Sequence, residues 1–227
     1  MGWLGDPRLE ALIDRLHARS AAQSEELTSY FLTRAREGSL NKNEFDEPSH
    51  RFMSDKLVAL DRDKAQFCYQ LCRALRARRV VEAGTSLGVS TLYLAAAVRD
   101  NLREDGGTGI VIGTEHEPEK AKAARAHFIE AGLSSLIELR EGDLRETLRD
   151  VGGPVDFMLV DIWTPMARPA LERVAPHLRP GAIVVSDNTR QFRAGYEDYF
   201  RFLADPRNGL RTLTLPFEGG LELTVRG

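Results

Sequence analysis

The stretch Val80-Val81-Glu82-Ala83-Gly84-Thr85-Ser86-Leu87-Gly88-Val89-Ser90 runs from a short apolar segment through a glycine-bearing turn into the start of a helix. A short apolar run bounded by glycine predicts a strand buried on both faces of a sheet. Gly84 and Gly88 allow the backbone to approach a ligand closely, because a Cβ would occupy that space. The stretch therefore predicts a strand-loop-helix junction of an α/β fold, with a ligand at the loop.

The loop also limits the kind of ligand. The four-residue spacing of Gly84 and Gly88 matches neither the dinucleotide pattern G-x-G-x-x-G nor a Walker loop, and no lysine is present to meet phosphates. Glu82 can accept hydrogen bonds from a cationic amino group, and the helix start near Ser90 offers free N–H groups to a carboxylate. A zwitterionic ligand without phosphates is expected. The alternative is that Glu82 caps a turn and the glycines only shape it.

From residue 79 onward, short apolar runs alternate with helical stretches. The expected strands are 79–83, 109–114, 136–139, 155–160 and 182–186, and the expected helices are 90–101, 119–131, 144–149, 167–174 and 196–203. Two last strands, 210–215 and 221–225, are joined by a link too short for a crossover helix, so they should pair antiparallel. The predicted fold class is α/β, with a Rossmann-like, mostly parallel sheet that ends in a C-terminal antiparallel hairpin and is flanked by helices.

The N-terminal part differs from the rest. Apolar residues at helical spacing predict helices at 9–16, 25–36 and 62–76, and the polar segment 38–49 is expected to be a loop. We therefore divide the chain into a helical extension or lid, 1–55, and a ligand-binding domain, 56–227. The extension could equally form a dimer surface, so a homodimer stays open.

Composition excludes several classes of protein. A 42% hydrophobic and 29% charged chain is typical of a globular protein, and a net charge of −3 gives no case for nucleic acid or an anionic membrane. No secretory leader and no membrane-spanning stretch is visible, so a cytoplasmic protein with a small-molecule substrate is expected. Cys68 and Cys72 should lie on one helix face as buried free thiols.

Polar residues follow the second and third expected strands. Glu115, with Glu117 as the reserve, lies where an acid can hold both hydroxyls of a ribose. His116 could touch an adenine or face solvent. Asp143, after Gly142, could meet the adenine amino group or cap the next helix. With the antiparallel ending, these positions narrow the ligand to S-adenosylmethionine.

The chain resembles the catechol O-methyltransferase-like family of S-adenosylmethionine-dependent enzymes over roughly Met53 to the C-terminus. The matching motifs are Glu82-Ala83-Gly84 with Gly88 and Ser90, Glu115 with Pro118, Val160-Asp161-Ile162-Trp163, Ser186-Asp187-Asn188, and Gly220-Leu221-Glu222. The resemblance implies that Asp161, Asp187 and Asn188 bind a divalent cation, usually magnesium. It also implies that residues 58–63 line the methionine end of the cofactor and the substrate entrance.

The chemistry of these three residues agrees with that placement. Asp161 ends the fourth expected strand and Asp187-Asn188 ends the fifth, so they should converge at the carboxyl edge of the sheet. Two carboxylates and an amide oxygen are hard ligands suited to Mg²⁺, which would acidify a substrate hydroxyl. The alternative is that both aspartates are turn or cap residues without a metal.

One position departs from the family pattern. The residue three beyond the first metal-binding aspartate is typically a lysine that serves as general base, whereas here it is Thr164. Threonine is a poor base at neutral pH, so either the metal alone acidifies the substrate or another group, such as His50, takes the proton. A different acceptor, or a site without catechol chemistry, is also open.

The predicted site can be stated residue by residue. Those assigned to the cofactor are Val58, Leu60, Glu82, Gly84, Thr85, Ser86, Gly88, Ser90, Glu115, His116, Gly142, Asp143, Asp161 and Trp163. Asp161 and Thr164 are assigned to catalysis, and Asp161, Asp187 and Asn188 to Mg²⁺. The predicted function is metal-assisted O-methylation of a small phenolic or catechol-like substrate. The alternatives are a non-catalytic cofactor-binding module and a nicotinamide-dependent oxidoreductase, and the sequence leaves the acceptor open.

Overall fold

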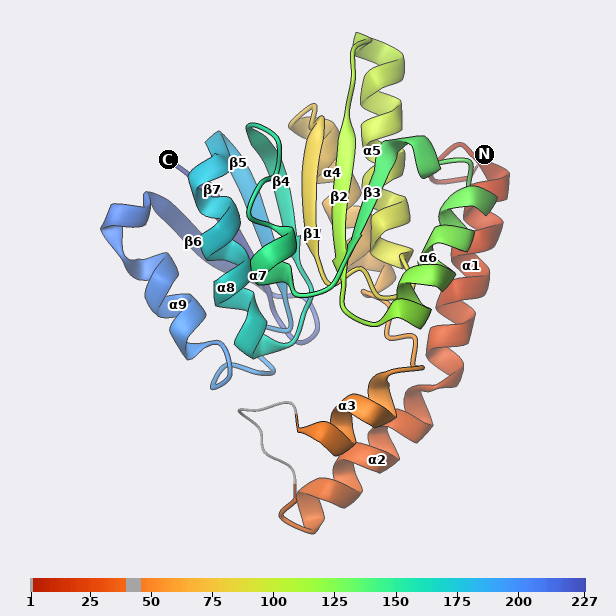
Figure 1. Ribbon diagram of the computed structural model, residues 1–227, viewed down its shortest axis with the longest axis vertical. Coiled ribbons are helices and arrows are strands. Elements are labelled where there is room, and N and C mark those ends of the chain that lie inside the picture. The colour runs from red at the N-terminus through yellow and green to blue at the C-terminus, as the bar shows by residue number, and fades with distance from the viewer. Residues whose placement is uncertain (1, 40–45) are drawn as a thin grey trace.

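The computed structural model describes residues 2–39 and 46–227 and shows one mixed sheet between layers of helices (Figure 1). The strands are β1 (Arg79–Ala83), β2 (Ile110–Glu115), β3 (Ile137–Glu141), β4 (Val155–Val160), β5 (Leu178–Asp187), β6 (Leu210–Leu215) and β7 (Leu221–Arg226). The helices are α1 (Pro7–Ala22), α2 (Ser24–Arg36), α3 (Glu47–Met53), α4 (Arg62–Ala74), α5 (Val89–Asp105), α6 (Pro118–Glu130), α7 (Leu144–Thr147), α8 (Thr164–Val174) and α9 (Glu197–Ala204).

The strand order is β3-β2-β1-β4-β5-β7-β6, and the predicted fold class is confirmed. Strands β1 to β5 pair in parallel, while β7 pairs antiparallel with both β5 and β6. The direction in which successive strands are added reverses between β1 and β4. In open α/β sheets, ligands bind in the crevice outside the carboxyl ends of the strands at such a reversal.

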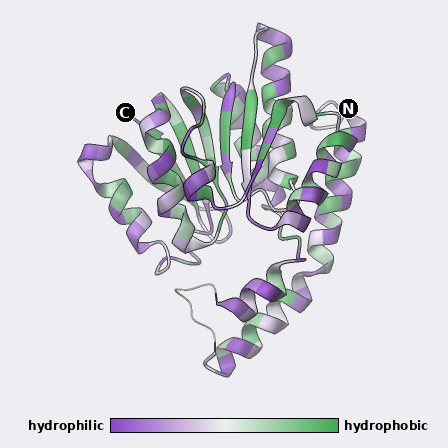
Figure 2. Cartoon of the chain, viewed as in Figure 1, coloured by the Kyte–Doolittle hydropathy of each residue, from purple (hydrophilic) through white to green (hydrophobic). Residues whose placement is uncertain are grey.

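The central strands β1, β2 and β4 are buried on both faces, which explains their apolar sequences, whereas the edge strands β3 and β6 are mostly half-buried or exposed (Figure 2). Val80 belongs to a core cluster with α1, α4 and α5, while its neighbour Val81 belongs to a cluster with α7, α8 and α9. Glu82 points to the same face as Val80 because side chains alternate along a strand. A carboxylate in that apolar layer needs a built polar environment.

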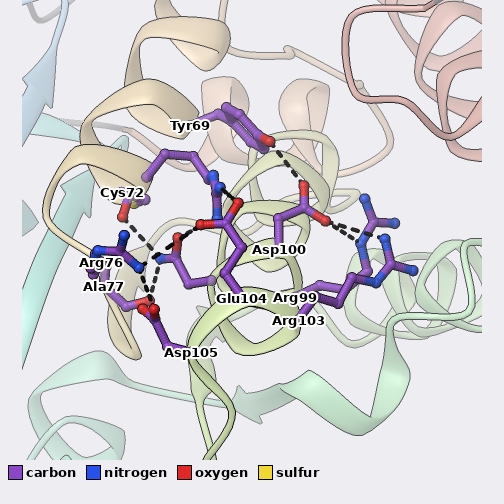
Figure 3. A network of polar contacts seen from close by, with 11 residues as sticks. Tyr69, Cys72, Arg76, Ala77, Arg99, Asp100, Arg103, Glu104 and Asp105 are labelled. Atoms are coloured by element: carbon purple, nitrogen blue, oxygen red, sulfur yellow. Dashed lines mark hydrogen bonds and ion pairs between the residues drawn. The ribbon is translucent and has the colours of Figure 1, made fainter.

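Polar contacts between α4 and α5 fix the position of α4 (Figure 3). The Tyr69 hydroxyl donates to Asp100 at 2.8 Å, and Arg73 and Arg76 pair with acids at the end of α5. The buried Asn101 amide donates to the backbone carbonyls of Cys72 and Ala77. These bonds satisfy carbonyl groups at the end of α4 and hold it on the sheet.

The N-terminal helices divide into two groups. The apolar face of α1, with Leu9, Leu12 and Ile13, joins the core of the sheet domain, whereas α2 has no buried residue. Helices α2 and α3 extend from the sheet domain as an arm (Figure 1), held together by stacked Tyr30 and Phe52 rings 3.7 Å apart. The apolar face of α1 therefore shares its hydrophobic core with the sheet, and the division at residue 55 stays a prediction.

The segment 38–49 was expected to be a loop throughout, and this is wrong at its end. Residues 40–45 lie outside the described part of the chain, but α3 begins at Glu47. Asp46 accepts a hydrogen bond from the Ser49 N–H at 2.9 Å, and Pro48 stands in the first turn. An aspartate cap and an early proline start a helix, and the high polarity of the segment hid that signal.

Within the described residues, no helix combines the length and the apolar content needed to cross a membrane. Cys68 and Cys72 are both buried and unpaired, as expected. Burial raises the pKa of both thiols, so they remain protonated and inert at neutral pH.

Candidate functional site

Glu82 organises the loop after β1. Its side chain is fully buried and accepts hydrogen bonds from the hydroxyls of Thr85 at 2.8 Å and Ser90 at 2.6 Å, and from that of Thr91. Burial raises the pKa of Glu82 above its usual value, while the three hydroxyls act against that rise. The carboxylate therefore ties the loop to the first turn of α5, and its oxygens already have partners within the chain.

The glycines of this loop make room for the chain itself. Gly84 has φ 97° and Gly88 has φ 88°, in the left-handed region that favours glycine. A Cβ on Gly84 would overlap the backbone carbonyl of Asp161, and one on Gly88 would lie 2.5 Å from the Phe128 ring. Both glycines therefore allow close packing of the loop against the end of β4 and against α6, and their contact with a ligand stays a prediction.

Glu115 lies at the carboxyl end of β2, beside the loop after β1. It accepts hydrogen bonds from the backbone N–H groups of Ser86 at 2.7 Å, and of His116 and Glu117 at 2.8 Å each. These bonds hold the carboxylate at the carboxyl end of β2, against the loop after β1. His116 is exposed, and Glu117 contacts His50 Nε2 at 2.9 Å instead of facing the loop.

The structure supports the capping interpretation of Asp143. Its carboxylate accepts a hydrogen bond from the Arg145 N–H at 2.8 Å at the start of α7 and pairs with the Arg145 guanidinium. The Arg145 hydrogen bonds lower the pKa of Asp143 to about 2. Gly142 precedes it with φ 114° and donates to the Glu115 carbonyl at 2.9 Å, which keeps this turn beside β2.

Three residues assigned to the cofactor, Val58, Leu60 and Trp163, differ in how exposed their side chains are. Val58 and Trp163 are about half exposed, at 49% and 42%, so both can contact a ligand. Leu60 is only 3% exposed and belongs to the hydrophobic core. Its side chain supports the segment from behind.

The predicted metal residues do converge. Asp161 follows β4, where its N–H donates to the Ala83 carbonyl at 3.0 Å, and Asp187 ends β5 with 4% of its surface exposed. Burial, and then the charge of Asp187, raise the pKa of Asp161 well above its usual value. Asn188, with φ 55°, donates its amide to Asp187 at 2.9 Å, and Gly219 packs against its Oδ1. The buried Asp187, the half-buried Asp161 and the Asn188 amide thus share one edge of the sheet.

Sequence reasoning missed Lys64 of α4. Its side chain is 1% exposed, and Nζ lies 2.8 Å from Asp187 Oδ1 and 2.8 Å from Asp61 Oδ2. Burial acts to lower the pKa of Lys64, but hydrogen bonds to Asp187 and Asp61 outweigh it and raise the pKa. A signal was available, because Lys64 stands four and eight residues before Cys68 and Cys72, on the face already assigned to the core.

Thr164, at the position of the family's lysine base, and His50, the alternative proton acceptor, lie on different helices. Thr164 begins α8 and packs so closely on Gly195 that a Cβ there would lie 2.5 Å from its hydroxyl oxygen. His50, on α3, lies with His116 and Glu117, and their ligand atoms are within 4.8 Å of one another. The structure therefore places His50 near the end of β2 rather than beside Asp161.

Comparisons with known proteins agree with this architecture. Residues 81–189 match the family model described as a methyltransferase domain. The chain is 32% identical over 132 residues to a catechol O-methyltransferase of Mycobacterium tuberculosis, covering 58% of this chain and 57% of that protein. It is 27% identical over 135 residues to a catechol O-methyltransferase of Niastella koreensis, covering 58% of each. The chain thus spans less than two thirds of the length of these relatives.

Solved structures show the same fold. The O-methyltransferase TomG from Streptomyces achromogenes, in complex with S-adenosylmethionine, has a TM-score of 0.67 and 26% identity, covering 78% of this chain and 85% of that one. An O-methyltransferase from Bacillus cereus in complex with S-adenosylhomocysteine has a TM-score of 0.66 and 21% identity, covering 74% and 83%. The structural likeness extends beyond the aligned sequence segments to most of each chain.

Proposed function

We propose that this chain methylates an oxygen of a small phenolic or catechol-like substrate with the assistance of a divalent cation. It belongs to the catechol O-methyltransferase-like family of class I S-adenosylmethionine-dependent methyltransferases. The observation that carries the proposal is the gathering of Glu115, Asp161 and Asp187 at the carboxyl ends of β2, β4 and β5. That edge flanks the reversal of strand order between β1 and β4.

The charges of the crevice suit S-adenosylmethionine. Glu82, Asp161 and Asp187 are acids whose pKa is raised by burial, so this region favours positive charge from a ligand. The cofactor carries a sulfonium and an ammonium group, and when bound it would supply a methyl group on positive sulfur that an oxygen nucleophile can accept, with the neutral thioether as the leaving group. Glu115 would hold the ribose, and the first turn of α5 would hold the carboxylate.

The metal residues fit a hard cation. Asp187 Oδ1 is buried, and the Lys64 ammonium lies 2.8 Å from it. With Asp161 and the Asn188 amide it offers the oxygen ligands that Mg²⁺ prefers. Asp161, Asp187 and Asn188 would hold the ion, whose charge would lower the pKa of an acceptor hydroxyl.

Thr164 affects which acceptors are suitable. A threonine hydroxyl packed against Gly195 cannot remove a proton at neutral pH, so the acceptor must supply its own acidity. A phenolic hydroxyl has a pKa of about 10, as in tyrosine, well below that of an aliphatic alcohol. Phenolic acceptors are therefore favoured, and the protein would act chiefly by placing the oxygen in line with the methyl group.

Calorimetry and a transfer assay test the proposal separately. We expect S-adenosylhomocysteine to bind, and labelled S-adenosylmethionine with Mg²⁺ to transfer its methyl group to at least one member of a panel of phenols and catechols. Asp187→Ala should reduce the transfer. Absence of cofactor binding would refute the proposal. Methyl transfer that is unchanged by chelators and by Asp187→Ala would refute the metal assistance.

One observation favours a second candidate, a cofactor-binding module without turnover. Thr164 stands where the family typically has its lysine base, and its hydroxyl is packed against Gly195. Tight binding of S-adenosylhomocysteine with no methylated product from any acceptor would support the module. A nicotinamide-dependent oxidoreductase loses its support, because β7 runs antiparallel between β5 and β6.

Location and assembly are also proposed. Two buried free thiols agree with a reducing compartment, so we propose that the protein is cytoplasmic. The arm formed by α2 and α3 stands clear of the core, and we propose that it acts as a lid over the site or as the surface of a homodimer. His50 on the arm contacts Glu117 at the end of β2, which favours the lid.

A further inference from the structure

Lys64 is a buried cation at the predicted metal site, and its neighbours are acids. Its ammonium lies 2.8 Å from Asp187 Oδ1 on β5 and 2.8 Å from Asp61 Oδ2 at the start of α4. The Lys64 side chain is 1% exposed and that of Asp187 is 6% exposed, so water screens this pair poorly. A charge pair in such a place is kept only when the geometry and the surrounding charges favour it.

The surrounding charges make Lys64 necessary. Asp161 faces the charges of Asp187, Glu82 and Asp61, which all oppose its ionisation, whereas the charge of Lys64 favours it. Acids on the loop before α4 and at the ends of β1, β4 and β5 therefore share the charge of this ammonium. Without a positive charge here, the buried carboxylate of Asp187 would lose its ion pair beside Asp161, and leaving one partner of a buried ion pair uncompensated costs about 3–5 kcal/mol.

The ammonium also occupies a ligand position. A divalent ion held by Asp161, Asp187 and Asn188 would need an oxygen of Asp187, and Mg²⁺ binds its ligands at about 2.0–2.1 Å. An ammonium 2.8 Å from Asp187 Oδ1 stands where an ion sharing that oxygen would be repelled. The Asn188 amide, bonded to the second oxygen of Asp187, leaves Oδ1 as the atom in competition.

We propose that the Lys64 ammonium is the resident cation of the cluster Asp61, Asp161 and Asp187, and that a divalent ion binds there only by displacing it. The inference rests on the proposed function, because it concerns the same cation site. It predicts weak metal binding and a chain that keeps its charge balance when no metal is present. Lys64 thus sets how far the protein depends on divalent ions.

Manganese titration tests the competition directly. The concentration of free Mn²⁺ is followed by electron paramagnetic resonance for the wild type, Lys64→Met, Lys64→Arg and Lys56→Met. Lys56 is the matched control, because it is also ion-paired with two acids, Glu26 and Asp55, and its side chain is 12% exposed. We expect at least tenfold tighter Mn²⁺ binding by Lys64→Met, about 1.4 kcal/mol, and no change for the other two variants.

Mn²⁺ affinity of Lys64→Met within twofold of the wild type, or weaker, would overturn the inference. Adding Asp187→Asn to Lys64→Met should abolish the gained affinity, because it removes the negative charge for which the two cations compete. If the double variant still binds tightly, the ion sits elsewhere and the inference is also overturned.

A measurement on the wild type covers the case in which Lys64→Met does not fold. Lysines are acylated with an N-hydroxysuccinimide ester and quantified by mass spectrometry while Mn²⁺ is increased. Labelling of Lys64 should rise as Mn²⁺ binds, whereas that of the exposed Lys122 should stay constant. Strong Mn²⁺ binding with unchanged protection of Lys64 would show that no displacement occurs.

The two proposals fail in different ways. Calorimetry with S-adenosylhomocysteine on the same preparations reports the cofactor site. Loss of cofactor binding in the wild type would refute the proposed function. Normal cofactor binding, together with a Mn²⁺ affinity that is the same in the wild type and in Lys64→Met, would refute only the proposal that Lys64 is the resident cation.

Discussion

The surroundings of Asp161 affect the stability of this protein. Burial, and then the charge of Asp187, raise its pKa well above its usual value, which means that the folded state resists its ionisation. An acid of this kind contributes to stability below its unfolded pKa of about 3.9, and the contribution is lost as the pH rises through its folded pKa. The contribution of Asp161 to the stability of the wild type therefore decreases as the pH rises from its unfolded pKa to its folded pKa.

Asp161→Asn should accordingly raise the melting temperature at neutral pH. The difference from the wild type should be small near pH 4 and should grow as the pH increases, because the raised pKa of Asp161 lets the unfolded wild type release this proton more readily than the folded state does. Differential scanning fluorimetry between pH 4 and 8 measures this. Asp198→Asn on the surface of α9 is the control and should show no such trend; a pH-independent difference for Asp161→Asn would contradict the argument.

Glu115 provides a residue-level test of the cofactor site. Glu115→Gln removes the charge that we assign to the ribose hydroxyls and weakens the bonds from Ser86, His116 and Glu117. Loss of a charge-assisted hydrogen bond costs about 1.5 kcal/mol or more, so the affinity for S-adenosylhomocysteine should fall about tenfold in calorimetry. Glu119→Gln, an exposed acid on α6, should bind like the wild type.

At the scale of elements, the junction of β1 and α5 depends on close contacts. Gly88→Ala would place a Cβ 2.5 Å from the Phe128 ring of α6 and strain a residue with φ 88°. The left-handed conformation costs about 1–2 kcal/mol and overpacking about 1–3 kcal/mol more. Chemical denaturation should show the sum as a lower free energy of unfolding.

Gly132→Ala separates the two contributions. Gly132 also has a positive φ, 67°, but nothing lies within 4 Å of its Cβ position. This variant should lose only the conformational part, about 1–2 kcal/mol. Equal losses for the two glycines would mean that the contact with Phe128 is unimportant.

At the scale of the whole molecule, the core and the arm should differ in stability. Helix α1 buries Leu9, Leu12, Ile13 and Leu16, whereas α2 buries no residue. Amide groups of α2 should therefore exchange with deuterium faster than those of α1, because few contacts oppose local opening. If the arm is a lid, S-adenosylhomocysteine should slow exchange in α3; an unchanged rate there would favour the dimer surface.

The sequence by itself determined the architecture. Apolar runs between helical patterns predicted strands β1, β4 and β6 at their observed bounds. The short link 216–220 predicted the antiparallel pairing of β6 with β7. These features are local, because hydrophobic periodicity and loop length act within a few residues. The meeting of Asp161 with Asp187 was also predictable, since the carboxyl ends of parallel strands share one edge.

Only the tertiary structure decided how the site is balanced. Lys64 on α4 reaches Asp187 on β5, His50 lies by Glu117 rather than Asp161, and the turn glycines allow close packing against Asp161 and Phe128. Each depends on distances between elements remote in sequence, which are set by packing of the helices on the sheet. The junction at Val80–Ser90 predicted the fold, but the packing of α4 on the sheet decided that the Lys64 ammonium lies at the carboxyl edge of the sheet.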